Sequence, residues 1–223
     1  MIPVARIELL DEVQLDAVNR YSKLNCVLKP TLFFEFHGTS QAAVAESATA
    51  VQEIAAENGG RDFQWATTTE ERAKLWTARH NAFYAAVALP PGCKPWTTDV
   101  CVPISRLAEC VLETQRRRRQ GPGLLAPLVG HVGDGNFHLI FPDGRRTTRP
   151  SCRRRKQINA RLIARALAMG GTVQRRAWRR RRQDGRICEA EHGESLEVMK
   201  AIKRALDPDN RMNPGKMISE IVD

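Results

Sequence analysis

Paired cysteines and long apolar runs are both missing from this chain of 223 residues. The six cysteines form no CxxC pair and no metal-type spacing, which predicts free thiols in a reducing cytosol and argues against a disulfide-stabilised secreted domain. No stretch approaches the roughly 18 consecutive apolar residues of a transmembrane helix. The start, Met1 to Leu10, has no basic region before a long apolar core, so we expect no signal peptide.

Basic residues outnumber acidic ones, but three short segments hold the excess. The formal net charge is +10, from 35 basic and 25 acidic residues. Arg116–Arg119, Arg145–Arg155 and Arg175–Arg186 contain 17 arginines and one acid, which leaves 18 basic and 24 acidic residues elsewhere. Apart from Trp178, these segments lack the aromatic side chains on which nucleic-acid bases stack. We therefore expect no nucleic acid as a partner, and a basic nucleic-acid-binding module is the alternative.

Strand and helix patterns alternate along the chain. Short apolar segments predict strands, and apolar residues at helical spacing after a capping residue predict helices. The expected strands are 32–37, 62–66, 97–103, 124–129 and 137–141. The expected helices run from Ser40 to about Glu57, from Thr69 to Pro90, from Ser105 onward, from Gln157 to Met169 and from Ser195 to Leu206. This order predicts an α+β sheet with helices on one face.

Two histidines flank a glycine-rich turn in the segment Gly130-His-Val-Gly-Asp-Gly-Asn-Phe-His138. If the glycines make a tight turn between two strands, both imidazoles can point to one side. Neutral imidazole suits zinc, manganese or iron, so His131 and His138 form a candidate half-site for a metal. The alternative is a hairpin with two hydrogen-bonded, partly buried histidines. A catalytic metal usually has three protein ligands, and spacing does not choose among the candidates for the third: Glu35, His37, Asp99, Glu191 and His192.

Five motifs follow one another in an order that resembles a known family. They are FEFHG at 34–38, LWxxRH at 75–80, WTTDVCVP at 96–103, GHVGDGNFH at 130–138, and DPDN with NPGK between 207 and 216. Together they resemble the C-terminal domain of FAD-linked oxidases over nearly the whole chain, in particular that of cytochrome-type D-lactate dehydrogenases. The resemblance implies one cap domain over residues 1–223, with a ferredoxin-like antiparallel sheet and helices on one face.

The resemblance also implies the chemistry. Met1 matches an internal stretch of the family, so we expect an N-terminal FAD-binding domain to be missing. His131 and His138 match ligands of a divalent metal such as zinc or manganese. Arg79 matches an arginine that binds the substrate carboxylate, with a surface salt bridge as the alternative. Asn213 lies in a motif that approaches the flavin, with a simple C-terminal turn as the alternative.

The implied reaction is the FAD-dependent oxidation of a small D-2-hydroxy acid, D-lactate first of all, to the 2-oxo acid. A cytochrome or a quinone is the expected electron acceptor. The expected location is the cytoplasm of a bacterium, with membrane association as an alternative.

The sequence departs from the family where the site should be completed. The family places Gly-Glu-His-Gly shortly after the Gly-Gly-Thr-Val of 170–173, with the Glu as third metal ligand and the His as general base. Here Arg176 and Ala177 hold these positions, and neither binds a metal nor accepts a proton at neutral pH. We therefore expect no retained catalytic residue and no dehydrogenase activity in the isolated chain. Glu191-His192-Gly193 resembles the lost motif but lies too far downstream to replace it.

A shifted reading frame explains the arginine-rich segments. Most arginine codons begin with CG, and one base later they encode Ala, Gly, Val, Asp or Glu. One permitted codon choice for 174–185 then reads Ser-Gly-Glu-His-Gly-Val-Gly-Val-Gly-Arg-Met, with Glu at position 176 and His at 177. We therefore predict that 116–121, 145–155 and 174–188 are out of frame. An inactive frameshifted fragment is the alternative to an active parent enzyme, and the nucleotide sequence decides between them.

Overall fold

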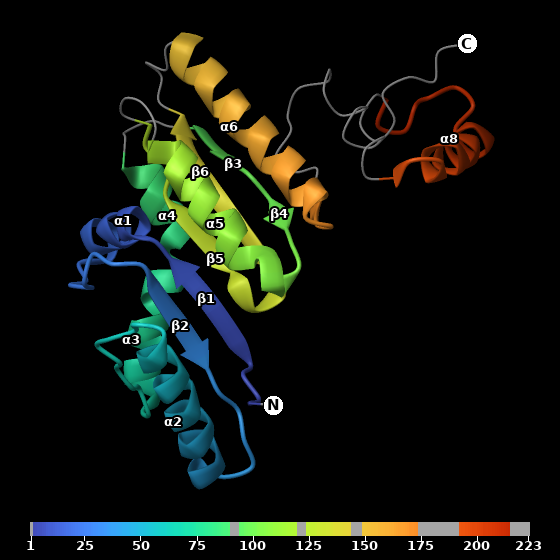
Figure 1. The fold of residues 1–223 in the computed structure, drawn as a ribbon. Coiled ribbons are helices and arrows are strands. Elements are labelled where there is room, and N and C mark those ends of the chain that lie inside the picture. Colours follow the sequence, from blue (N-terminus) through green and yellow to red (C-terminus); the bar gives the residue numbers. More distant parts are fainter. Residues whose placement is uncertain (1, 90–93, 120–123, 144–148, 174–191, 215–223) are drawn as a thin grey trace.

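An antiparallel sheet runs through the domain (Figure 1). The computed structural model describes residues 2–89, 94–119, 124–143, 149–173 and 192–214. Within these residues the strands pair in the order β2-β1-β5-β6-β4-β7, and β3 also pairs with β6. The strands are β1 (Arg6–Leu10), β2 (Thr31–Glu35), β3 (Lys94–Thr97), β4 (Val100–Cys101), β5 (Leu128–His131), β6 (Asn136–Asp143) and β7 (Thr172–Val173).

Helices fill most of the connections between these strands. They are α1 (Glu12–Ser22), α2 (Gln41–Glu57), α3 (Thr69–His80), α4 (Ala82–Ala88), α5 (Ile104–Arg119), α6 (Arg149–Ala168) and α8 (Ser195–Leu206). A 3-10 turn, η1 (Val132–Asp134), joins β5 to β6. None of the helices in the described ranges is long and apolar enough to cross a membrane.

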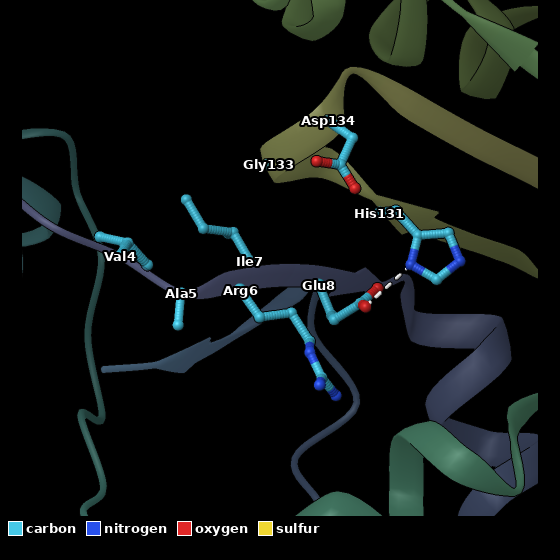
Figure 2. A pocket seen from close by; sticks show the side chains of 8 residues that line it. All are labelled: Val4, Ala5, Arg6, Ile7, Glu8, His131, Gly133 and Asp134. Atoms are coloured by element: carbon cyan, nitrogen blue, oxygen red, sulfur yellow. Dashed lines mark hydrogen bonds and ion pairs between the residues drawn. The ribbon is translucent and has the colours of Figure 1, made fainter. Parts of the chain in front are cut away.

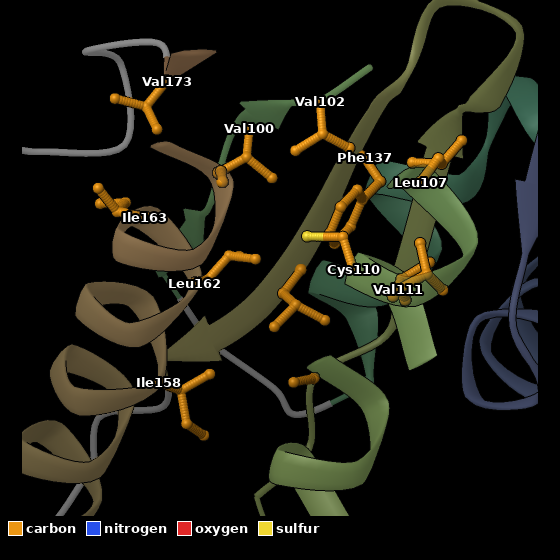
Figure 3. Close-up of a cluster of buried hydrophobic side chains, with 14 of the residues drawn as sticks. Val100, Val102, Leu107, Cys110, Val111, Phe137, Ile158, Leu162, Ile163 and Val173 are labelled. Carbon is orange, nitrogen blue, oxygen red and sulfur yellow. The ribbon is translucent and has the colours of Figure 1, made fainter. Parts of the chain in front are cut away.

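The segment β4-α5-β5-β6-α6-β7 is a ferredoxin-like βαββαβ unit. Its strands lie in the order β5-β6-β4-β7, so the two strands of the hairpin are adjacent and the first strand lies beside the last. Side chains of α5 and α6 pack on one face of this unit (Figure 3), among them Cys110, Val111, Ile158 and Leu162. The predicted α+β class, with a ferredoxin-like antiparallel sheet, is confirmed, and in this unit both helices cover one face.

The opposite face of the sheet is also apolar. In β5, Leu128 points towards α5 and α6 while Val129 packs with the helices of the other side, and in β6 Leu139 and Ile140 divide in the same way. Because successive strand residues point to opposite faces, consecutive apolar residues such as these require cover on both. Residues of α1, α3 and α4 provide that second cover.

Several boundaries differ from the predictions. Helix α3 is capped by Thr68 rather than Thr69, because Thr68 and Glu71 form a reciprocal capping box. Helix α5 already begins at Ile104, so Ser105 does not cap it, and α6 begins at Arg149, well before Gln157. Helix α8 has the predicted bounds.

Two predicted strands are also corrected. Residues 62–66 form no strand, since Asp62 has a left-handed backbone with φ 59°. The strand predicted at 97–103 is divided into β3 and β4 at Thr98. There the Thr98 hydroxyl accepts a hydrogen bond from Leu139 N at 2.8 Å, in place of a regular ladder bond.

A buried ion pair ties the first strand and helix to the rest. Asp11 caps α1 by accepting a hydrogen bond from Gln14 N at 2.8 Å, and it also accepts one from Leu128 N at 3.1 Å. Arg118 of α5 pairs with the same carboxylate and donates to the carbonyl of Ala126. Arg118 lies in the first arginine-rich segment, so part of that segment belongs to the core. Its out-of-frame origin stays a prediction.

Candidate functional site

The two histidines of the hairpin lie on the same face of the sheet. In the register of β5 and β6, His131 is opposite Asn136, and His138 therefore lies diagonally across from His131. Their ring centroids are 5.9 Å apart, with the planes nearly perpendicular at 86°. The predicted geometry, two imidazoles on one side of a glycine turn, is confirmed, while their role as metal ligands stays a prediction.

Glycine makes this hairpin turn possible. Gly135 has φ +77°, and a Cβ atom there would lie 2.1 Å from the carbonyl oxygen of Val102. A side chain at this position therefore meets backbone, which cannot move aside as a flexible side chain could. At Gly130, a Cβ atom would lie 2.8 Å from the Cβ of Phe137. The glycines thus set the close approach of the turn to its neighbours and, with it, the position of both imidazoles.

A buried carboxylate from the first strand joins this site. Strand β1 pairs with β5 so that Leu10 faces Val129 and Leu9 faces Gly130, which brings Glu8 beside His131. Glu8 Oε1 accepts a hydrogen bond from His131 Nδ1 at 2.8 Å (Figure 2), and its Oε2 accepts one from Arg79 Nε at 2.9 Å. Glu8 is only 3% exposed. The structure thus brings Arg79 and His131 together through a residue that the sequence analysis missed.

The charge state of Glu8 follows from its partners. Burial alone would raise its pKa, but the hydrogen bonds from His131 and Arg79 and the charge of Arg79 outweigh burial, so the pKa lies below its usual value. The carboxylate is therefore ionised at neutral pH and can only accept hydrogen bonds. It follows that the proton shared with His131 belongs to Nδ1 of the ring.

His138 has a comparable arrangement with a different acceptor. Its Nδ1 lies 3.0 Å from the carbonyl oxygen of Thr98, and because a carbonyl only accepts, this nitrogen is the donor. Burial lowers the pKa of His138, although the hydrogen bond to Thr98 opposes that shift. The ring is therefore neutral at pH 7, with its lone pair on Nε2. Metal-binding histidines are commonly held in this way, with the second nitrogen donating to a carbonyl or carboxylate.

Within the described residues, the candidates for a third metal ligand form no group with these rings that could hold a metal. Glu35 and His37 contact each other at 3.2 Å, and the His37 side chain is 74% exposed. Asp99 approaches His138 at Nδ1, 3.4 Å away, and accepts a hydrogen bond from Asn136 at 2.8 Å, so it lies on the donating side of the ring. Glu191 lies outside the described residues, and His192 lies three residues before the first residue of α8.

The residues present therefore fit a divalent metal in part. The chain supplies two imidazole Nε2 atoms as suitable donors, and that of His131 also lies 3.2 Å from Arg79 Nη2. Within the described ranges, no three His, Cys, Asp or Glu side chains form a group that could hold the ion. The positions of the missing Glu and His, Arg176 and Ala177, lie outside those ranges.

Asn213 lies in a turn after α8, with a left-handed backbone of φ 49°. Asp207 builds this turn by accepting hydrogen bonds from Arg211 N and Met212 N, each at 2.8 Å. Helix α8 lies away from the sheet in Figure 1. The predicted role of Asn213 beside the flavin is not tested by this arrangement.

A small pocket opens beside the Glu8 carboxylate (Figure 2). Its lining residues are Val4, Ala5, Arg6, Ile7, Glu8, His131, Gly133 and Asp134. The cavity measures about 150 Å³, room for a small organic acid but well below the size of typical drug or cofactor pockets.

Residues 1–217 match the family of FAD linked oxidases, C-terminal domain. The chain belongs to this family. Among members of the FAD-linked oxidase family, it is 45% identical to the zebrafish protein "Probable D-lactate dehydrogenase, mitochondrial", with 97% of this chain and 43% of the relative covered. It is 37% identical to "D-lactate dehydrogenase [cytochrome], mitochondrial" of Arabidopsis thaliana, over 97% of this chain and 38% of the relative. The chain thus spans less than half the length of these relatives.

Solved structures support the fold assignment. The structure of p-cresol methylhydroxylase with substrate bound matches with a TM-score of 0.64 at 16% identity, over 98% of this chain and 47% of that chain. At this identity the likeness shows the fold alone. The predicted family, the C-terminal domain of FAD-linked oxidases, is confirmed, and D-lactate dehydrogenases are among the relatives of this chain.

Proposed function

We propose that this chain is the substrate-binding cap of a flavoenzyme that oxidises a D-2-hydroxy acid, D-lactate first of all, to the 2-oxo acid. The observation that carries the proposal is the cluster of Arg79, His131 and His138 on one sheet face, which joins a carboxylate-binding group to two nitrogen donors. A 2-hydroxy acid needs such a pair of functions, because its carboxylate and its hydroxyl are adjacent. The names of the D-lactate dehydrogenase relatives support the same substrate class.

Arg79 binds the substrate carboxylate in this proposal. Its Nε is occupied by Glu8, while its side chain is 16% exposed and keeps further N–H groups for a ligand. A guanidinium forms two parallel hydrogen bonds with a carboxylate, a geometry that lysine cannot reproduce. Arg79 does form a salt bridge, the alternative to a substrate role, but its partner Glu8 is buried, with a side chain only 5% exposed.

His131 and His138 would hold a divalent metal such as zinc or manganese through Nε2. When bound, the metal supplies a positive charge that polarises the hydroxyl of the substrate. The two rings themselves are each anchored through Nδ1, His131 by Glu8 and His138 by the Thr98 carbonyl. Two ligands leave the site incomplete, which agrees with the replacement of the family's Glu and His by Arg176 and Ala177.

An N-terminal FAD-binding domain is the partner that this proposal requires. FAD, held mainly by that domain, supplies the acceptor for the α-hydrogen of the substrate, and a cytochrome or a quinone accepts the electrons afterwards. Helix α8 has an apolar face suited to such a partner, with Val198 at 62%, Ile202 at 53% and Leu206 at 72% exposure. Asn213 follows this helix and is proposed to reach the flavin. The cytoplasmic location, with membrane association as its alternative, also remains a proposal.

Nucleic-acid binding is less well supported by the described arginines. Arg116 and Arg117 both pair with Glu113, and Arg118 is buried against Asp11. These three side chains are therefore partly neutralised and do not form a free basic patch. An inactive frameshifted fragment of the same flavoenzyme remains the alternative to an active parent.

The test uses a hybrid enzyme. The FAD-binding half of the zebrafish relative is joined to residues 1–223, and D-lactate-dependent reduction of a dye is measured. We expect no turnover with the chain as it stands, and turnover when Arg176→Glu and Ala177→His restore the ligand and the base. Flavin content and a thermal melt establish that both hybrids are folded. No turnover by a folded, flavin-loaded restored hybrid would contradict the proposed function, and turnover by the 223-residue chain alone would overturn the need for the FAD domain.

A further inference from the structure

We propose that Glu8 is a positioning residue of this site: its two carboxylate oxygens fix His131 in one tautomer and fix the direction of Arg79. The proposal rests on the proposed function for its meaning, but the contacts that carry it are independent of the substrate. Oε1 lies 2.8 Å from His131 Nδ1, and Oε2 lies 2.9 Å from Arg79 Nε. One carboxylate therefore orders two side chains that are 52 residues apart in the sequence.

The tautomer follows from the chemistry of the acceptor. The Glu8 carboxylate accepts from the Arg79 guanidinium at one oxygen and faces Nδ1 of His131 with the other, and a carboxylate paired in this way only accepts, so His131 carries its hydrogen on Nδ1. The hydrogen bond made by one ring nitrogen determines which tautomer is present. The lone pair is thereby placed on Nε2, the same nitrogen that His138 leaves free through its bond to the Thr98 carbonyl. Both rings of the hairpin are thus held with hydrogen on Nδ1, by two different acceptors.

The contact between Arg79 and His131 leaves that lone pair available. Arg79 Nη2 lies 3.3 Å from Nδ1 and 3.2 Å from Nε2, almost equidistant. The lone pairs of an imidazole diverge, so a donor aligned with one nitrogen would lie much farther from the other. The guanidinium therefore rests against the ring and does not occupy the Nε2 lone pair. Glu8 holds it there by Nε, and the Nη groups remain the ones that can turn to a ligand.

The placement of Glu8 makes this effect specific. Its strand neighbour Leu10 on the same face is fully buried, and Glu8 itself is 3% exposed, so water cannot substitute for the carboxylate. Glu35, on the adjacent strand β2, has a similar pair of partners in Arg6 and His37, but the His37 side chain is 74% exposed. Glu35 is therefore a matched control: a carboxylate between an arginine and a histidine, with a side chain that is 30% exposed.

The decisive experiment measures ring tautomers in the 223-residue chain. With ¹⁵N-labelled histidine, NMR spectra taken at the alkaline end of a pH series, where the ring signals no longer change, distinguish Nδ1–H from Nε2–H for each neutral ring. We expect the wild-type chain to show His131 with at least a tenfold excess of Nδ1–H. A wild-type His131 that is mainly Nε2–H overturns the proposal without any variant, so the test does not depend on a mutant that folds.

Variants then test the cause. In Glu8→Gln the amide NH₂ replaces one acceptor, so we expect mixed tautomers at His131 or a broadened Arg79 Nε–H signal, while Glu35→Gln leaves both unchanged. Unchanged signals in Glu8→Gln overturn the proposal, as does an equal change in Glu35→Gln. The restored hybrid separates this result from the function: Glu8→Gln should raise the D-lactate KM at least tenfold more than it lowers kcat. If the tautomer result stands but the restored hybrid never oxidises D-lactate, the proposed function fails and the positioning role of Glu8 does not.

Discussion

Replacing Arg118 by methionine should unfold this domain at a markedly lower temperature. The Arg118 side chain is 5% exposed and its partner Asp11 is fully buried. Without the guanidinium, the Asp11 carboxylate keeps two backbone donors, Gln14 N and Leu128 N, but loses its compensating charge. Removing one partner of a buried pair costs about 3–5 kcal/mol. For a domain of this size that corresponds to a fall in Tm of about 6–20 °C.

The stability lost in Arg118→Met should depend on pH, and the pKa of Asp11 gives the direction of that dependence. Burial raises the pKa of Asp11 above its usual value, and the charge of Arg118 opposes that rise. Without Arg118 the pKa rises further. A carboxyl group whose pKa is higher in the folded state than in the unfolded state binds its proton more tightly when the protein is folded. The folded state therefore gains stability as the pH falls from the folded pKa to the unfolded pKa. The deficit of the variant should therefore be largest at neutral pH and shrink in acid.

The assay is thermal unfolding followed by circular dichroism at pH 7 and pH 4, with Arg117→Met as the matched control. Arg117 is the neighbouring residue, its side chain is 45% exposed, and it pairs with Glu113 on the surface. A surface pair of this kind contributes about 0–1 kcal/mol. Equal melting temperatures for the Arg118 and Arg117 variants would refute the reasoning, because they would show that the pair with Asp11 is not buried in solution.

Three further predictions concern the hairpin and the site. Gly135→Ala should lower the free energy of unfolding by about 2–6 kcal/mol, since it adds left-handed backbone strain to a close contact with the Val102 carbonyl. Gly59→Ala, at φ +82° in open space, should lower it by about 1–2 kcal/mol. Equal losses for the two variants in urea unfolding would argue against the close approach at Gly135. Thr98→Val leaves Leu139 N without its side-chain acceptor and should cost about 1–3 kcal/mol. The control is Thr77→Val, a half-buried threonine whose hydroxyl only donates to Ala73 O of its own helix; it should cost under about 0.5 kcal/mol, again by urea unfolding. The pKa of Glu8 is lowered, so its contribution to stability should be present above about pH 4.5 and lost as the pH falls through the folded pKa. Between pH 6 and pH 3, the free energy of urea unfolding should therefore fall less in Glu8→Gln than in the wild type. An equal dependence of this free energy on pH in both proteins would count against an ionised, paired Glu8.

The sequence predicted the parts of this site that depend on local pattern. The hairpin with His131 and His138 was recognisable because glycine, aspartate and asparagine cluster between two short apolar segments. Helix α8 was predicted with its observed bounds, since Ser195 begins a regular apolar spacing that ends before Pro208. In both cases the signal lies within a dozen neighbouring residues.

Glu8 was missed because its role depends on pairings that are distant in the sequence. It lies 123 residues from His131 and 71 from Arg79, and no local pattern carries that information. A signal was present: Glu8 stands between Ile7 and Leu9, and a charged residue flanked by apolar ones suggests a buried partner. The second layer of helices was missed for a related reason, since short apolar segments do not show how many faces are covered.

The most direct test of the proposed substrate site is the role of Arg79 in binding D-lactate. It is measured by anaerobic reduction of the flavin in the restored hybrid. Arg79→Met is compared with Arg72→Met, an arginine on the same helix that lies on the exposed side. Loss of charge-assisted hydrogen bonds to a carboxylate costs about 1.5–3 kcal/mol, or roughly tenfold to more than a hundredfold in affinity. The account predicts that Arg79→Met needs at least tenfold more D-lactate for half-maximal flavin bleaching while Arg72→Met behaves as the parent. Bleaching of Arg79→Met at the parent's D-lactate concentration would contradict it.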